Sequence, residues 1–314
     1  MINLPFLKKS KVGISVSTDY IFYAELEKNG KEYRVKDIKS FDSKGCIKPS
    51  LTDANITDPE LFKKAIKTIA GNKRVYASLS IPDVSVKTAL FEFESIPSKK
   101  AELEKLIKWK MEKSLPFTMD DAQISYQALN KKSILVSVIR KGILYQYEEL
   151  LREAGVEPVL IDTASSHIFN LFHNIIMKEG ENFIFLNLIN AVFTLIIFKK
   201  GCPDFIRVKA LRRGSGEIKR IRDELLASLK FYSHSKEISD LTSIYYIADI
   251  NIETKDLIED SAIQVRRLGI EQIKWLNTFF TNPPVSPFFK GGIKESPPSP
   301  LLNLLPAIGA AVES

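Results

Sequence analysis

The sequence predicts an α/β fold built from two related domains, with a small βαββα unit inserted in the first. Short runs that alternate apolar and polar residues, as strands do, are separated by segments whose apolar residues recur every three to four positions, as in helices. A strand-hairpin pattern opens the chain and returns near residue 182, which is typical of a duplicated domain. The inserted unit lies between the two strand groups.

The composition is that of a chain with a substantial core and a basic surface. Its 314 residues are 45% hydrophobic and 26% charged, which suits two domains of ordinary size. The formal net charge of +7 favours contact with an anionic surface such as a membrane. The basic residues form no dense stripe, so we expect no nucleic-acid partner. Cys46 and Cys202 lie far apart and indicate neither a disulfide framework nor a metal site.

No segment predicts export or a membrane span. The opening stretch MINLPFLKKSK has too short an apolar run for a signal peptide. The most apolar window, 183–198, is shorter than a membrane span and contains Asn187 and Asn190. Two buried strands joined by a turn explain it better. We therefore expect a cytoplasmic protein.

The first domain is expected to comprise residues 1–82 and 157–180. Its opening elements are a hairpin, a strand, a helix and a further strand, at 11–27, 32–41, 57–71 and 74–82; a strand at 157–161 and a helix close it. The first of these helices has clear start and stop signals. Thr57 is expected to cap it, with Glu60 completing a capping box, and Gly71 is expected to end it.

The inserted βαββα unit is expected at residues 83–156. Its elements are a strand, a helix, two strands and a second helix, at 86–97, 98–114, 122–129, 133–140 and 142–154. The LPF tripeptide at 115–117 interrupts the pattern of the first helix, and Gly155 ends the second.

The second domain is expected at residues 181–314. Three antiparallel strands begin it, followed by a helix, a strand and two helices, at 216–234, 243–250, 254–259 and 270–280. A proline-rich segment, 282–300, is expected to be a flexible loop. The apolar stretch that follows should form a final helix that returns to this second domain.

The order of these elements resembles the actin-like (ribonuclease H-like) fold, in the branch with an insertion in its first domain, and within it the PilM family of type IV pilus assembly proteins. The motifs that carry the resemblance are GISVSTDYIF (13–22), the IP…LPF…Y pattern (96–126), VLIDTASSHIFNLF (159–172), DELLASLKFYSHS (223–235) and LPAIGAAV (305–312). Together they span most of the chain.

The nucleotide-binding positions that the resemblance implies are changed. Actin-like ATPases hold phosphates with two glycine hairpins, each led by an aspartate that organises Mg²⁺, and the adenosine with a glycine pair. The residues at these places are Ser15, Ser17 and Thr18 in the first hairpin, Asn187 and Ile189 in the second, and Ala248 and Asp249 after a later strand. We therefore expect no enzyme activity, no catalytic or metal-binding residue and no cofactor, with MgATP binding as the alternative.

The connection at 207–232 is shorter than the resemblance implies. It runs from a strand of the second domain directly into the SLKFY helix. The fourth subdomain of the fold is therefore expected to be reduced or absent. A nucleotide normally lies against that subdomain, so the shortening favours the same interpretation.

The resemblance implies a scaffold. PilM binds the N-terminal cytoplasmic tail of the inner-membrane protein PilN, so we expect a PilN-like tail as partner, at the periphery of the inner membrane. A pilus motor ATPase and self-association are further expectations. An extended peptide would lie in a groove between the first domain and the insertion, with Leu115, Pro116 and Phe117 as candidates. Ordinary packing at a helix end is the other explanation of these three.

Three alternatives remain from the sequence. One is a nucleotide-dependent actin-like ATPase, another an FtsA-like membrane-associated adaptor, and the third the cytoplasmic half of a type II secretion L protein. RRGSGE (212–217) can present N–H groups to a phosphate, although a plain helix start is the simpler interpretation. MINLPFL (1–7) and LLNLLP (301–306) both resemble the partner's tail, so self-occupancy of the groove is a further hypothesis.

Overall fold

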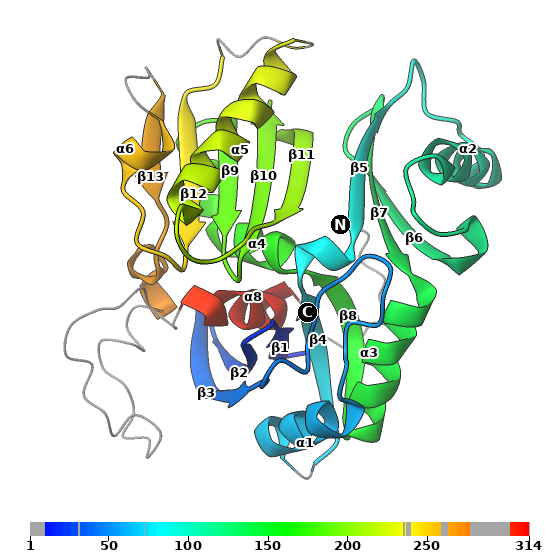
Figure 1. The fold of residues 1–314 in the computed structure, drawn as a ribbon, viewed down its shortest axis with the longest axis vertical. Coiled ribbons are helices and arrows are strands. Elements are labelled where there is room, and N and C mark those ends of the chain that lie inside the picture. The colour runs from blue at the N-terminus through cyan, green and yellow to red at the C-terminus, as the bar shows by residue number, and fades with distance from the viewer. Residues whose placement is uncertain are drawn as a thin grey trace.

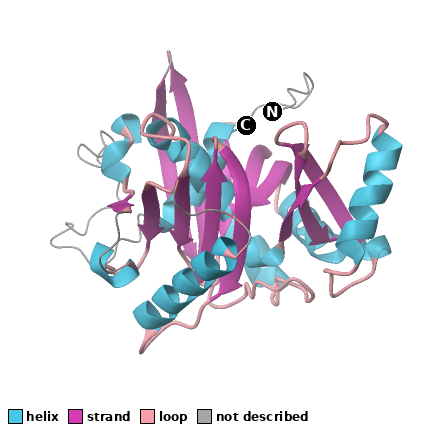
Figure 2. Cartoon of the chain, turned by 90° about the horizontal axis from the view of Figure 1, so that it is seen from above, coloured by secondary structure: helices cyan, strands magenta, loops and turns pink. Residues whose placement is uncertain are grey.

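A computed structural model describes residues 10–30, 32–71, 73–234, 236, 240–258, 263–276 and 302–313. Its described strands form three sheets: β3-β2-β1-β4-β8, β11-β10-β9-β12-β13 and β5-β7-β6. Figure 1 shows the first sheet at the bottom, the second above it and the third to one side. Seen from above, the third sheet and its helix stand beside the rest of the molecule (Figure 2).

The first two sheets have the same strand arrangement. Each is a three-stranded antiparallel meander whose first strand also pairs in parallel with a later strand, to which a further parallel strand is added. The strands of the first sheet are β1 (Val12–Val16), β2 (Tyr20–Asn29), β3 (Glu32–Asp42), β4 (Val75–Ile81) and β8 (Val156–Thr163). Those of the second are β9 (Phe183–Leu188), β10 (Val192–Lys199), β11 (Cys202–Ala210), β12 (Ser243–Ala248) and β13 (Gln264–Arg267). This repeat confirms the duplicated strand pattern expected from the sequence.

The helices cover both faces of the first sheet and the outer face of the second. They are α1 (Pro59–Ala70), α3 (Lys141–Glu153), α4 (Ala164–Ile176), α5 (Glu217–Ser233), α6 (Thr254–Leu257) and α8 (Leu305–Glu313), with 3₁₀ turns η1 (Asp83–Ser85), η2 (Met119–Asp121), η3 (Ile270–Gln272) and η5 (Leu302–Leu304). Helices α4 and α8 form the layer between the two large sheets (Figure 1). One continuous core cluster joins both sheets through them.

The inserted unit ends earlier than the sequence predicts. It contains β5 (Lys87–Glu92), α2 (Lys100–Glu112), β6 (Ala122–Ala128) and β7 (Ser133–Arg140), and α2 covers one face of its sheet. Helix α3, expected inside the 83–156 unit, instead buries Tyr147 and Leu151 in the core of the first domain beside Phe62 of α1. The sequence pattern of α3 shows an apolar face that could pack on the inserted sheet or on the first domain. Its packing on α1 and β8 assigns it to the first domain.

The final helix also corrects the predicted boundary of the second domain, 181–314. Helix α8 packs on β1 and β2 of the first sheet and on α4. Glycines permit this close approach, because Gly13 of β1 faces the backbone of Ala307, and Gly309 of α8 faces that of His167. Residues 302–306, which make up most of the LLNLLP stretch, are part of this layer, since Leu302, Leu304 and Leu305 are buried in the core between the sheets. These residues are therefore not available as a groove ligand.

Several local expectations are also revised. Asp58, not Thr57, caps α1, with its Oδ1 accepting from the N–H of Leu61 at 2.9 Å. The expected helix at 270–280 begins with the short 3₁₀ turn η3, and the strand β13 had not been predicted. The proline-rich segment 282–300 and the opening residues 1–7 lie outside the described residues. None of the described helices is long and apolar enough to cross a membrane.

Candidate functional site

The two hairpins that the sequence singled out meet at a small cavity between the large sheets. The cavity is lined by Ser15, Val16, Pro82, Asp83, Ala164, Asn187, Ile189, Asn190, Val192 and Pro306. Its volume is about 10 Å³, which is room for about one water molecule. Of the seven positions predicted for a degraded nucleotide pocket, Ser15, Asn187 and Ile189 line this cavity.

The first hairpin turn satisfies its own polar groups. The N–H and the hydroxyl of Ser17 both donate to the carbonyl oxygen of Tyr20 at 2.9 Å, and the N–H of Tyr20 donates back to Ser17 Oγ at 3.1 Å. Thr18 is exposed in the turn, and its backbone carbonyl oxygen accepts a hydrogen bond from the Ser43 hydroxyl. Neither Ser17 nor Thr18 lines the cavity.

A chain of buried polar groups links two residues of the cavity lining, Asn187 and Asp83, through Ser165. Asn187, where the resemblance implies an aspartate, donates from Nδ2 to Ser165 Oγ at 2.8 Å. The N–H of Ser165 in turn donates to Asp83 Oδ1 at 3.2 Å. Burial raises the pKa of Asp83 to about 6, although the hydrogen bonds from Ser165 oppose the rise.

Asp83 was not among the candidate residues predicted from the sequence. A signal was present, because a polar residue two positions after the buried parallel strand β4 lies at the carboxyl edge of the sheet, where sites of α/β folds form. Asp162 is the penultimate residue of the neighbouring strand β8, and the buried His167 follows in α4. Burial lowers the pKa of His167 to about 4, and Asp162 opposes this. Among the described residues no cluster of three metal-ligating side chains occurs.

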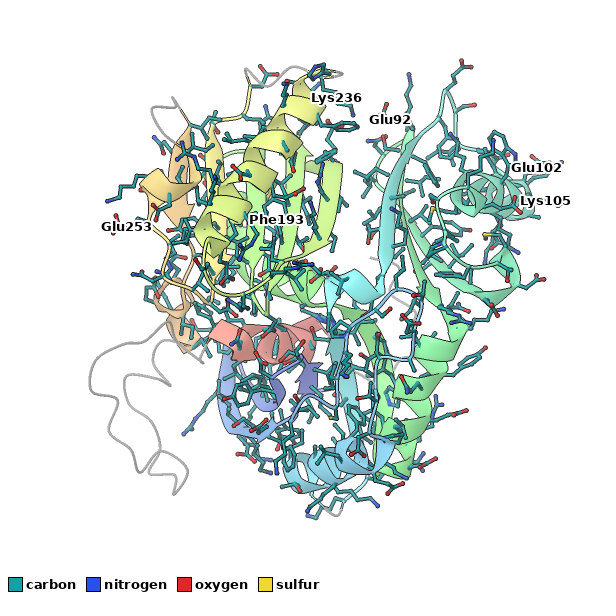
Figure 3. The ribbon with its side chains drawn as sticks, in the orientation of Figure 1. Glu92, Glu102, Lys105, Phe193, Lys236 and Glu253 are labelled. Carbon is teal, nitrogen blue, oxygen red and sulfur yellow. The ribbon has the colours of Figure 1, made fainter. Side chains whose placement is uncertain are left out.

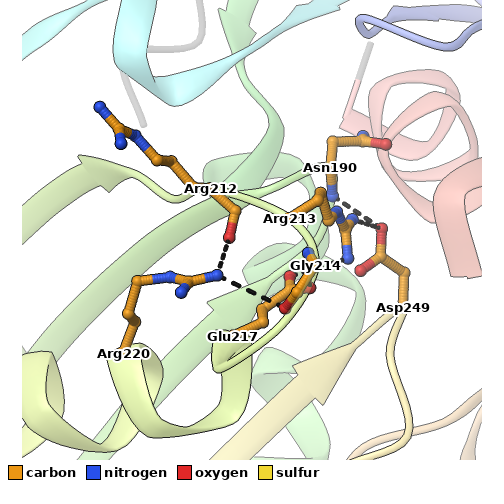
Figure 4. A network of polar contacts seen from close by, with 7 residues as sticks. All are labelled: Asn190, Arg212, Arg213, Gly214, Glu217, Arg220 and Asp249. Carbon is orange, nitrogen blue, oxygen red and sulfur yellow. Dashed lines mark hydrogen bonds and ion pairs between the residues drawn. The ribbon is translucent and has the colours of Figure 1, made fainter.

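The second hairpin is tied to the strand that carries the expected adenosine motif (Figure 4). Asp249, just after β12, accepts a hydrogen bond at Oδ2 from the N–H of Asn190 at 2.8 Å. The same oxygen accepts from Arg213 Nη2 at 2.5 Å. Ala248 is fully buried, and its carbonyl accepts from Arg267 at 3.2 Å. Asp249 therefore points toward the hairpin turn, whereas Ala248 packs in the core.

The RRGSGE stretch forms the loop between β11 and α5 rather than an open phosphate loop. Glu217 Oε2 accepts from the N–H of Gly214 at 3.3 Å. Arg220 donates to the carbonyl oxygens of Arg212 at 2.7 Å and Ser215 at 2.8 Å. Both arginines of the stretch are exposed, and Arg213 in addition pairs with Asp249.

The candidate peptide residues lie on the inserted unit. Leu115 and Phe117 are half-buried against its core, and Pro116 is exposed. None of the three lines one of the hollows found among the described residues. Their role in binding stays a prediction.

An ion-pair bridge joins the inserted unit to the second domain. Lys236, just beyond α5, lies 2.8 Å from Glu92 of β5 and 2.7 Å from Asp204 of β11. Figure 3 shows Lys236 and Glu92 at the same end of the molecule, facing one another between the two sheets. The bridge holds two sheet edges together across the top of the inserted unit.

Larger hollows lie at the opposite end of the first domain. Two adjoining surface depressions of about 610 and 570 Å³ share Gly71, Lys73 and Arg74. Their arginines are already engaged, since Arg74 and Arg152 both pair with Glu157. The depressions are open to solvent and lie away from both hairpins.

Comparison with known proteins identifies the fold. No family model and no curated protein matches the chain. A solved PilM–PilN type IV pilus biogenesis complex aligns with a TM-score of 0.70 at 14% identity, over 98% of both chains. The cytoplasmic domain of EpsL, an inner-membrane component of the type II secretion system of Vibrio cholerae, aligns with a TM-score of 0.55 at 9% identity, over 86% of this chain and 94% of that one.

A third similar structure is described by its fold. A Bacteroides thetaiotaomicron protein with an actin-like ATPase fold and unknown function aligns with a TM-score of 0.50 at 12% identity, over 88% of this chain and 99% of that one. Identities this low show the fold and not the function. The chain therefore has the actin-like α/β fold predicted from its sequence, and it is similar in structure to PilM and to the EpsL cytoplasmic domain.

Proposed function

We propose that this protein is a cytoplasmic scaffold of a type IV pilus or related secretion complex, which binds the N-terminal tail of a PilN-like inner-membrane protein without hydrolysing ATP. The observation that carries the proposal is the alignment over 98% of both chains with a PilM seen in complex with PilN. The positive net charge supports a place at the periphery of an anionic membrane. A pilus motor ATPase and further copies of the chain remain additional proposed partners.

The small size of the cavity between the two hairpins supports a role without nucleotide chemistry. A phosphate group needs several N–H donors and space at the hairpin turns. Here the space is a cavity of about 10 Å³, with the side chain of Ile189 in its wall. The N–H of Asn190 is bound by Asp249, and that of Ser17 by its own turn. A triphosphate with Mg²⁺ would have to displace these groups.

The proposal includes a fourth subdomain that is reduced or absent. Strand β11 ends at Ala210 and α5 begins at Glu217, so a short loop joins them. We infer that a reduced fourth subdomain leaves the adenosine side of the cleft without the surface that a nucleotide needs.

A type II secretion component is the second candidate. The likeness to the EpsL cytoplasmic domain covers 94% of that domain and favours it. The TM-score is lower than that with PilM, 0.55 against 0.70, so we prefer the pilus scaffold.

Fluorescence anisotropy with a labelled N-terminal peptide of a PilN protein tests the proposal. We expect a Kd of about 1–100 μM and no binding of a scrambled peptide. Phe117→Ala should weaken binding by about tenfold, because an anchoring aromatic side chain contributes roughly 1–2 kcal/mol at such an interface. Trp109→Ala is the matched control: Trp109 lies on α2 of the same unit and is 60% exposed. Equal binding of the native and scrambled peptides would overturn the proposal.

A further inference from the structure

The turn of the second hairpin already holds an anionic group, and that group belongs to the protein. Asp249 Oδ2 accepts from the N–H of Asn190 at 2.8 Å and from the guanidinium of Arg213 at 2.5 Å (Figure 4). The Asp249 side chain is 6% exposed. A backbone N–H and a guanidinium that converge on one oxygen are the donors with which proteins bind carboxylate and phosphate groups.

The donors are held in place by contacts that do not involve Asp249. Asn190 and Ala191 both have left-handed backbone conformations, with φ of 57° and 56°, in the tight turn that joins β9 to β10. Arg213 also pairs with Glu217 at 3.2 Å. Arg220 binds the carbonyls of Arg212 and Ser215 on either side. Removal of the Asp249 carboxylate should therefore leave both donors near their present positions.

The surroundings oppose a second anion while Asp249 is present. Glu217 contacts Arg213 directly, and Asp19, in the turn of the first hairpin, also acts on Arg213 electrostatically. The carboxylates of Asp249, Glu217 and Asp19 thus all attract the Arg213 guanidinium, the first two by direct ion pairs. An added phosphate would meet this negative charge and no unbound N–H at Asn190.

We propose that Asn190, Arg213 and their supporting loop form an anion-binding site whose resident ligand is the carboxylate of Asp249. Small oxyanions, such as formate or inorganic phosphate, enter the site once that carboxylate is removed. In the native protein Asp249 joins the end of β12, the β9–β10 turn and the β11–α5 loop. The inference rests on the proposed absence of nucleotide from this cleft, but it does not depend on peptide binding.

Chemical rescue of the full chain tests this site. Thermal unfolding of the wild type and of Asp249→Ala is measured in sodium chloride, sodium formate and sodium phosphate at equal ionic strength. We expect Asp249→Ala to lower the Tm by about 4 °C in chloride, since it removes charge-assisted hydrogen bonds from a buried site. Formate and phosphate should restore at least half of this loss with a saturable dependence on concentration, whereas the wild type shows no saturable response.

Two controls separate the site from general salt effects. The double variant Asp249→Ala/Arg213→Ala should show no rescue, because one donor is gone. Asp256→Ala removes a more exposed acid of the same region, which caps α6, and should show no saturable response to formate. Should Asp249→Ala fail to fold, Asp249→Ser enters the same titration.

The outcomes separate this inference from the proposed function. An unchanged Tm of Asp249→Ala, or an equal effect of formate on every variant, would overturn the anion site alone. A rise in the Tm of the wild type with MgATP, in contrast, would contradict the proposed function as well.

Discussion

Helix α8 should not accept a side chain at Gly309, where it lies against α4. A Cβ at this position would come within 2.3 Å of the carbonyl oxygen of His167 and 2.7 Å of its carbonyl carbon. Both atoms belong to the backbone, so no side-chain rotation relieves the overlap, and α8 would have to shift by about 1 Å.

The magnitude follows from two opposing effects. Overpacking costs about 1–3 kcal/mol, and the upper end applies where backbone meets backbone. Alanine in place of glycine in a helix returns up to about 1 kcal/mol. We therefore expect Gly309→Ala to lower the free energy of unfolding by about 2 kcal/mol.

Urea unfolding followed by tryptophan fluorescence measures this loss. The ring of Trp275 lies 5.8 Å from that of Tyr33, whose hydroxyl donates to the carbonyl of Val312 in α8 at 3.3 Å, so its emission reports on this layer. Gly142→Ala in α3 is the matched control, because a Cβ there meets no atom within 4 Å. It should stabilise by up to about 1 kcal/mol. A Gly309→Ala protein as stable as the wild type would refute the packing described for α8.

Two further predictions concern the bridge and the buried cleft groups. Lys236→Ala should lower stability by no more than about 1 kcal/mol, since the pair is partly exposed, but should speed amide exchange along β5 and β11; unchanged exchange there would contradict the bridge. The pKa of Asp83, raised to about 6 by burial, means that its contribution is present below about pH 4 and is lost as the pH rises to 6. The pKa of His167, lowered to about 4 by burial, means that its contribution is present above about pH 6.5 and is lost as the pH falls to 4. Asp83→Asn should therefore make urea stability rise more steeply between pH 4 and 6.5, by up to about 3 kcal/mol, and His167→Gln should shift the slope in the opposite direction by a comparable amount; equal slopes in all three proteins would contradict both assignments.

The strand pattern was predictable because each strand contains its own signal. Alternation and tight turns lie within a few residues of one another, so the hairpins and the repeated meander could be located from the sequence. Strand β13 was missed because it has four residues, three of them exposed, and no apolar alternation. Its pairing with β12 supplies what its sequence lacks.

The positions of the helices could not be predicted in the same way. The apolar face of a helix shows that one side is buried but not against which sheet. Helix α3 packs on α1 rather than on the inserted sheet, and α8 crosses from the end of the chain to β1. The contact of Gly309 with His167 joins residues 142 positions apart, so no local sequence pattern predicts it.

The candidate site was predicted in outline. Ser15, Asn187 and Ile189 do line one cavity, because both hairpins occupy equivalent places in the two sheets. The pairing of Asp249 with Arg213 depends on the β11–α5 loop, whose orientation no sequence pattern indicates. Asp83 was not predicted because it follows a strand whose pattern indicates only a buried core.

Isothermal titration of the purified chain with the N-terminal peptide of a PilN protein, with and without MgATP, tests the proposed scaffold most directly. We predict a Kd of about 1–100 μM that MgATP leaves unchanged, and no heat of binding from MgATP alone. A clear heat from MgATP together with no heat from the peptide would contradict the proposal and indicate a nucleotide-dependent actin-like ATPase.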